Sequence, residues 1–297
     1  MRRMVPVNAT LPAEPGDIGR QLEAAFRTFW VHWKPGFLLA FIGQLIGLLP
    51  AVLMPRGGDP MQTMDGLIEW YSRPGTWLLF ALVVVCQVFL FTALSYRLGC
   101  CGRGQDPGLV ASVNRALARF ASALGAFLLY VGGLLLSMLP MLMIVGWAAS
   151  DGLAPLTRSL IGLLALAALG LPTWWSLAAS LNLFAVALER RSAMAAISRS
   201  LALIRGHWWI SSAVLGIVLL VHLTVSLVIG LVIGMVALGS TMDTSPGDPS
   251  QASSLLIGVQ LLMSPLAALL QVLLVCGLLA LFNQRVLAVD QGAGETA

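Results

Sequence analysis

Long apolar runs alternate along this chain with shorter stretches that mix charged and apolar residues. The six longest runs cover residues 37–54, 77–96, 123–147, 159–188, 210–238 and 254–284. A helix of about 20 apolar residues crosses the hydrocarbon core of a bilayer. Transmembrane β-strands are shorter and alternate polar with apolar residues, whereas residues 78–85 are apolar throughout. The pattern predicts an all-α polytopic membrane protein with six transmembrane helices.

The composition agrees with a membrane environment. Only 10% of the residues are charged and 58% are hydrophobic, whereas about a quarter of the residues in a soluble domain are charged. We expect a single six-helix transmembrane domain over residues 17–288. A flexible N-terminal tail of residues 1–16 and a C-terminal tail of residues 289–297 are expected to flank it.

The basic residues are distributed unevenly between the two sides of this topology. Of the 17 lysines and arginines, all but Arg56, Arg73 and Arg158 fall in segments on the same side as both termini. Loops rich in lysine and arginine stay in the cytoplasm. We therefore expect both termini to be cytoplasmic.

Three amphipathic stretches lead into the odd-numbered spans, over about residues 18–33, 109–124 and 194–208. Each places apolar residues on one helical face and basic or hydroxyl residues on the other. Helices of this type lie in the plane of the membrane interface. Their spacing of roughly 85 to 90 residues suggests a threefold repeat of a surface helix followed by a membrane hairpin.

Arginines on the polar faces of these stretches are candidate ligands for lipid headgroups. We expect Arg115, Arg119, Arg199 and Arg205 to bind anionic membrane lipids. An acidic surface of a membrane or cytoplasmic protein is the other partner that a basic face favours. Nucleic acid is not expected as a partner, because the arginines are dispersed next to membrane spans and belong to no polar recognition module.

Catalytic motifs are missing from the sequence. The three histidines lie far apart, and no HExxH or GxSxG motif and no phosphate-binding glycine loop occurs. The interiors of the spans carry no Asp, Glu, Lys or Arg, which disfavours a proton pathway through buried carboxylates. Amides such as Gln44, Gln87 and Gln271 are expected to hydrogen-bond between helices. We expect no enzyme activity, no metal and no cofactor.

The fourth span has the most unusual sequence. Near its middle stands Pro172, followed by Trp174 and Trp175 and then by Ser180 and Asn182. Proline frees a backbone carbonyl, which hydroxyl and amide groups nearby can satisfy. Two interpretations stay open. These residues pack between helices, or Trp174, Trp175, Ser180 and Asn182 line an intramembrane groove for a lipid or substrate.

Residues 174–209 resemble a family of six-span bacterial inner-membrane proteins. It includes the YciC-type proteins and the membrane domain found beside glycerophosphodiester phosphodiesterases. The shared pattern, A-x-x-R-S-x-x-L-x-x-G before an aromatic residue, falls on Ala196, Arg199, Ser200, Leu203 and Gly206. One departure is Leu201, where relatives often have tryptophan. The resemblance implies a bacterial inner (plasma) membrane protein whose membrane domain is not a known catalytic module.

Two functions follow as hypotheses. The first is a non-enzymatic integral inner-membrane protein that organises anionic lipid or scaffolds a membrane or cytoplasmic partner. The alternative is a transport or permease component that moves a lipid or small amphiphile through a groove near the middle of span four.

Overall fold

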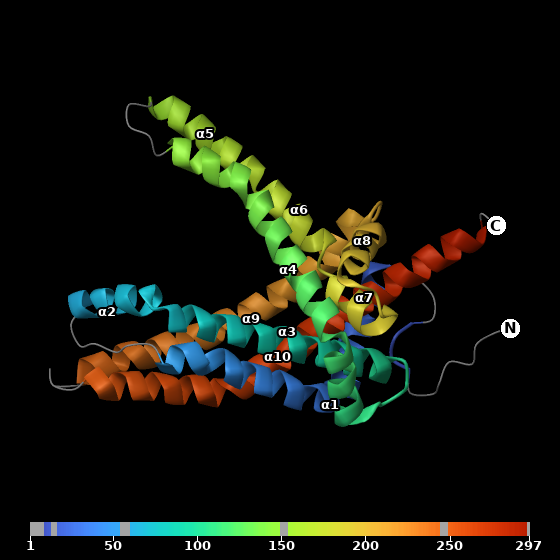
Figure 1. The fold of residues 1–297 in the computed structure, drawn as a ribbon, viewed down its shortest axis with the longest axis horizontal. Coiled ribbons are helices and arrows are strands. Elements are labelled where there is room, and N and C mark those ends of the chain that lie inside the picture. Colours follow the sequence, from blue (N-terminus) through green and yellow to red (C-terminus); the bar gives the residue numbers. More distant parts are fainter. Residues whose placement is uncertain (1–8, 13–16, 54–59, 149–153, 244–248, 296–297) are drawn as a thin grey trace.

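The structure, a computed structural model, describes residues 9–12, 17–53, 60–148, 154–243 and 249–295 (Figure 1). Within these residues all regular structure is helical, which confirms the all-α class. The helices are α1 (Ile18–Leu53), α2 (Pro60–Ser72), α3 (Pro74–Gly102), α4 (Gly108–Ala148), α5 (Pro155–Ala168), α6 (Gly170–Ala178), α7 (Asn182–Glu189), α8 (Ala193–Ile204), α9 (Trp208–Asp243) and α10 (Pro249–Glu295).

The six predicted spans are confirmed as helical segments long and apolar enough to cross a membrane. They are Ile18–Leu53, Pro74–Gly102, Gly108–Ala148, Ser159–Glu189, Trp208–Val232 and Ile257–Val289. The chain is therefore built as a multi-pass membrane protein. The remaining helices of the described chain, α2 and α8, are too short to span a bilayer.

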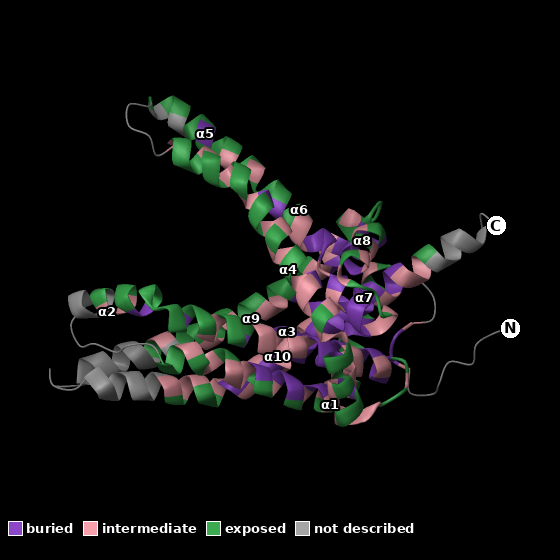
Figure 2. Cartoon of the chain, viewed as in Figure 1, coloured by how far each residue is buried: buried purple, intermediate pink, exposed green. Residues whose placement is uncertain are grey.

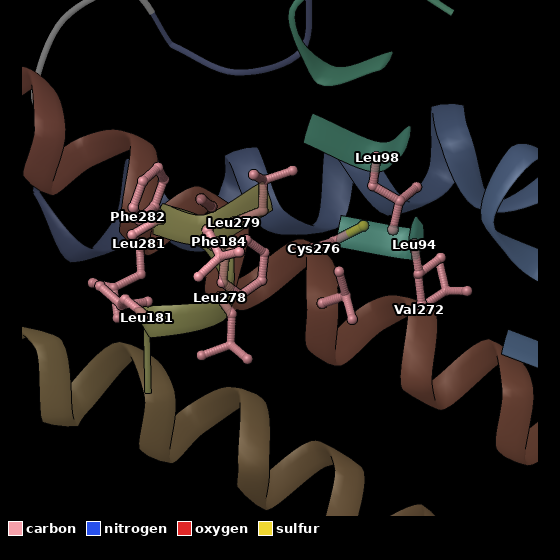
Figure 3. Close-up of a cluster of buried hydrophobic side chains, with 14 of the residues drawn as sticks. Leu94, Leu98, Leu181, Phe184, Val272, Cys276, Leu278, Leu279, Leu281 and Phe282 are labelled. Carbon is pink, nitrogen blue, oxygen red and sulfur yellow. The ribbon is translucent and has the colours of Figure 1, made fainter. Parts of the chain in front are cut away.

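Helix α10 forms the centre of the molecule. It packs most extensively against α1, and also against α9 and α3. Figure 2 shows that buried residues gather around the middle and C-terminal half of this helix. In Figure 3 its side chains meet those of α3 and of the segment around α7, and the rings of Phe184 and Phe282 stack with centroids 6.0 Å apart.

Small residues allow the helices to approach closely. A Cβ atom on Gly36 of α1 would lie 3.1 Å from Leu94 of α3 and 3.3 Å from Val272 of α10. Gly277 of α10 similarly faces Val218 of α9. In lipid, helices associate through close packing and hydrogen bonds, because the acyl chains are as apolar as the side chains. The glycines therefore set the crossings of the central bundle.

Two arms of helices diverge from a common region. Helices α1, α3, α9 and α10 run together, while the outer half of α4 and helix α5 leave them as a separate hairpin (Figure 1). Apolar side chains on that hairpin are widely exposed: Leu135, Leu136, Leu139, Leu142, Met143, Leu156, Leu160 and Leu163. Acyl chains can cover such surfaces in a bilayer.

The three amphipathic stretches take three different forms. The first is separated from its span by a kink at His32 (φ −119°, ψ 15°), three residues before Pro35, whose ring cannot fit a regular helix interior. The second runs into its span without a kink, as α4. The third is the separate helix α8, which ends at Ile204 and is followed two residues later by Gly206, in the left-handed region at φ +80°. The stretches share a place in the chain order but not a shape.

Residues near both termini are anchored at the same end of the bundle. The backbone N–H groups of Thr10 and Leu11 donate to the carbonyl of Gly102, at 2.9 and 3.0 Å. Asn283 of α10 donates its amide to the carbonyl of Pro12 at 3.0 Å. Residues 9–12, which the sequence analysis placed in a flexible tail of residues 1–16, thus bond to the end of α3 and to α10.

At the other terminus, α10 remains helical to Glu295, beyond the expected domain end at residue 288. The expected tail of residues 289–297 is therefore helical over most of its length. Residues 1–8, 13–16 and 296–297 lie outside the described residues.

Candidate functional site

Span four is broken in two places, where the sequence suggested one long helix. The first, at Leu169, is the loss of a single helical hydrogen bond between α5 and α6, since Leu169 itself keeps helical dihedrals (φ −60°, ψ −20°). Pro172 has no N–H to bond the carbonyl of Ala168, so the regular hydrogen bonding of α5 ends at Ala168. Thr173 stabilises the connection from α5 to α6, because its N–H and its hydroxyl both donate to the carbonyl of Leu169, at 3.2 and 2.8 Å.

The second break, at residues 179–181, separates α6 from α7 and is bridged by a side chain from another helix. The hydroxyl of Ser200 on α8 donates to the carbonyl of Ala178 at 2.7 Å and accepts the N–H of Leu181 at 3.1 Å. Ser180 bonds back to Leu177 at 2.8 Å. Backbone groups inside a membrane protein need such partners, because no water replaces them.

A cavity of about 360 Å³ lies beside this second break. Its walls come from α3, from α4, from residues 179–183 and from α10. These are the elements that meet where the α4–α5 hairpin leaves the bundle (Figure 1). We call it the vertex cavity.

The polar groups of the vertex cavity are uncharged. Gln87 donates its amide to the carbonyl of Gly43 at 2.6 Å, and Gln44 donates to the side-chain oxygen of Gln271 at 2.8 Å. These bonds confirm that the glutamines connect helices. Asn182, also in the cavity wall, is only 3% exposed. Apolar walls with a few convergent polar groups are typical of small-molecule sites.

The four residues predicted to line a groove have different positions. Ser180 and Asn182 line the vertex cavity. Trp175 does not; its indole N–H donates to the carbonyl of Tyr130 at 2.9 Å, and its ring covers Gly133 so closely that a Cβ there would overlap it. Trp174 is 45% exposed and lines a second cavity, near Arg205.

The four predicted headgroup arginines also separate into two kinds. Arg199 pairs with Glu189 on α7, at 3.2 Å. Arg115 lies 5.2 Å from the ring centroid of Tyr96 and donates to the carbonyl of Ala187 at 3.4 Å. Two arginines thus have partners within the protein.

Arg119 and Arg205 are the other kind, since neither forms an ion pair with a described residue. Arg205 is exposed and Arg119 is half-buried. Their guanidinium groups are therefore free for a ligand.

Each position of the motif over residues 196–206 has a structural role. Ala196 and Leu203 are buried, Arg199 holds Glu189, Ser200 bridges the break in span four, and Gly206 adopts a positive φ. The motif therefore holds α8 against the broken span four, and its glycine forms the turn that follows α8.

Some residues of the site could not be identified from the sequence. Gln87, Gln271 and Tyr130 line the vertex cavity, but only the occurrence of amides inside apolar runs hinted at their importance. The described residues contain no group of three or more His, Cys, Asp and Glu side chains that could share a metal ion.

Comparison of the chain with protein-family models, with curated proteins and with solved structures found no match. The resemblance of residues 174–209 to YciC-type proteins thus stays a prediction.

Proposed function

We propose that this protein is a non-enzymatic membrane protein that binds a lipid or a lipid-like amphiphile in the vertex cavity. One observation carries the proposal. The cavity combines apolar walls with uncharged amides where two arms of transmembrane helices diverge. Val84 in its wall is 39% exposed, so an amphiphile can reach the cavity from the surrounding apolar phase.

The size of the cavity supports a part of a lipid as its occupant. A volume of about 360 Å³ falls near the lower end of the range for small-molecule sites. It fits the polar linkage of an amphiphile and the first carbons of its chains. The rest of the chains then extends past the partly exposed Val84 into the surrounding apolar phase.

The chemistry of the walls supports an uncharged polar group. A charge enclosed away from water needs an opposite charge, and no charged side chain of the described residues lines the cavity. Amides offer both donors and acceptors to hydroxyl, ester and amide groups. A neutral glycerolipid, with ester and hydroxyl groups next to its chains, has the chemistry that these walls recognise.

The proposed location is the bacterial inner membrane, with both termini in the cytoplasm. Its support is the concentration of basic residues on the terminal side. The position can be tested with Arg103→Cys in a background without the native cysteines. A membrane-impermeant maleimide should label this residue in inverted vesicles and not in intact spheroplasts, and the reverse would overturn the orientation.

The binding proposal is tested with a diacylglycerol that carries a diazirine in one acyl chain. Val84→Trp fills the vertex cavity from a partly exposed position. Leu82→Trp is the matched control, because Leu82 lies on the same helix, is 58% exposed and does not line the cavity. Both proteins are compared with the wild type in neutral nanodiscs.

We expect Val84→Trp to reduce photolabelling several-fold and Leu82→Trp to leave it unchanged. Equal labelling of the two variants would overturn the proposal, since the probe would then reach only the outer surface. Thermal unfolding of each variant shows whether its fold is intact.

Transport of the same amphiphile is the second candidate. The observation that favours it is the discontinuity of span four beside the cavity, because discontinuous helices form substrate sites in many transporters. A fluorescent diacylglycerol analogue reconstituted in liposomes should cross the bilayer faster with the wild type than with Val84→Trp. Equal crossing rates with the wild type and with Val84→Trp would rule out transport through the cavity. Binding would still be decided by the photolabelling experiment.

A further inference from the structure

A second cavity, of about 560 Å³, lies between α6, α8 and the start of α9. Among its lining residues are Trp174, Ser198, Arg205 and Trp208, and the others are apolar or glycine. We call it the joint cavity, because the short connection from α8 to α9 forms one of its walls. It shares no lining residue with the vertex cavity.

The joint cavity carries a positive charge that the protein does not neutralise. Arg205 is the one charged residue in its wall, and its guanidinium group has no ion pair with the described residues. Gly206, at φ +80°, turns the chain directly after it. Arg199, earlier on the same helix, is by contrast occupied by Glu189.

Near the start of α9, further donors lack acceptors among the described residues. The indole nitrogen of Trp208 is buried and has no hydrogen-bond partner. One turn along α9, Ser211 accepts the Nε–H of Arg285 at 3.2 Å. Arg285 is 5% exposed, and one of its terminal nitrogens has no partner. Arg285 also has no ion pair with a described residue, so an anion bound close to the start of α9 would stabilise this region.

The position of the joint cavity suits a lipid phosphate. Trp174 is 45% and Trp209 is 80% exposed, and tryptophans of transmembrane helices concentrate at the level of the headgroups. Trp208 is also the first residue of a span. An arginine fork at this level matches the oxygens of a phosphate.

We propose that the joint cavity binds the phosphate of an anionic phospholipid through Arg205, with the tryptophans packed against its glycerol and chains. This site is separate from the proposed amphiphile site. Free phosphate presents the same oxygens, so the experiment includes both sources.

The test is a titration followed by native mass spectrometry of the full chain in a neutral detergent. Phosphatidylglycerol, phosphatidylcholine and inorganic phosphate are added in separate arms. The variants are Arg205→Gln and Arg103→Gln, the latter an exposed arginine that lines neither cavity and that the predicted topology puts on the same side of the membrane. The two variants have the same net charge.

We expect Arg205→Gln to weaken binding of phosphatidylglycerol about tenfold, and Arg103→Gln to change it less than about twofold. Phosphatidylcholine carries a cation beside its phosphate, so its binding should depend less on Arg205 than that of phosphatidylglycerol. Unchanged phosphatidylglycerol binding by Arg205→Gln would overturn the proposal. So would binding of inorganic phosphate that depends on Arg205 and that phosphatidylglycerol fails to displace, since the ligand would then be the free anion.

Photolabelling of the vertex cavity in the same variants keeps the two proposals apart. Arg205→Gln should retain wild-type labelling by the diacylglycerol probe, which also shows that the variant is folded. A protein that binds phosphatidylglycerol through Arg205 but is not labelled in the vertex cavity would refute the amphiphile site alone.

Discussion

The hydroxyl of Ser200 accepts the backbone N–H of Leu181 at 3.1 Å, across the break in span four. Ser200 also donates to the carbonyl of Ala178 at 2.7 Å, so one side chain satisfies both edges of the break. Because Asn182 follows directly in the wall of the vertex cavity, the same contact holds that wall in place. Helix α8 is thereby a brace for the proposed binding site.

Replacing Ser200 with alanine should destabilise the protein. Ala178 and Leu181 would each keep a buried polar backbone group without a partner, and the expected loss is about 1–3 kcal/mol in the free energy of unfolding. Ser198→Ala on the same helix is the control, because Ser198 is exposed and bonds only to Ala195. Denaturant titrations in mixed micelles measure both, and equal stabilities would show that the bridge does not brace the break.

Gly133 and Trp175 give a prediction about the α4–α6 contact. Gly133→Ala should expel the indole ring, break its hydrogen bond to Tyr130 and lower stability by about 1–3 kcal/mol. The neighbouring Gly132→Ala is a matched control, because a Cβ at Gly132 meets nothing within 4 Å. Equal thermal midpoints for the two variants would show that Trp175 does not pack closely on Gly133.

The pair between Arg199 and Glu189 should couple α8 to α7. Both side chains are 19% exposed, and hydrogen bonds between charged groups contribute about 1.5–3 kcal/mol when shielded. Arg199→Gln should therefore cost more stability than Arg191→Gln, since Arg191 meets the same carboxylate from a side chain that is 48% exposed. In a double-mutant cycle with Glu189→Gln, additive losses would disprove the coupling.

Asp106 predicts a dependence of stability on pH at the start of α4. The N–H of Gly108 and the charge of Arg97 hold the pKa of this carboxyl below its ordinary value. A lowered pKa in the folded state means that the contribution is present above the unfolded pKa, about 4, and is lost as the pH falls through the folded pKa.

Asp106→Asn should keep an acceptor for Gly108 and lose the charge. The thermal midpoint of the wild type should therefore exceed that of the variant at pH 7, and the difference should shrink as the pH falls below about 4 through the folded pKa. A difference that stays constant over this range would mean that the ionised carboxylate does not contribute.

The spans could be predicted from the sequence because the bilayer imposes one simple demand, an apolar run of sufficient length. The apolar runs do not, however, show how the helices pack against one another. Residues that face lipid and residues that face another helix are both apolar, so the run does not show which side of α10 forms the centre. The amides Gln44 and Gln271 were predicted to connect helices, but their pairing across 227 positions could not be predicted.

Polar patterns were equally limited as predictors of the site. Arg119, Arg199 and Arg205 look alike as basic residues on amphipathic stretches, yet of these three only Arg199 forms an ion pair with a described residue, Glu189. Pro172 pointed to an irregular span, but the second break lies seven or more residues later and depends on Ser200 from another helix. Which polar groups have a partner within the protein depends on contacts between segments far apart in the sequence, and these contacts could not be predicted.

The most direct test of the vertex cavity is to map where the diazirine-labelled diacylglycerol attaches to the wild-type protein, by mass spectrometry of its peptides. We expect attachment within residues 84–91, 127–130, 179–183 and 271–278, which line the cavity from four parts of the chain. Attachment confined to outward-facing leucines such as Leu136 and Leu160 would contradict this expectation, because the probe would then have found only the lipid-facing surface.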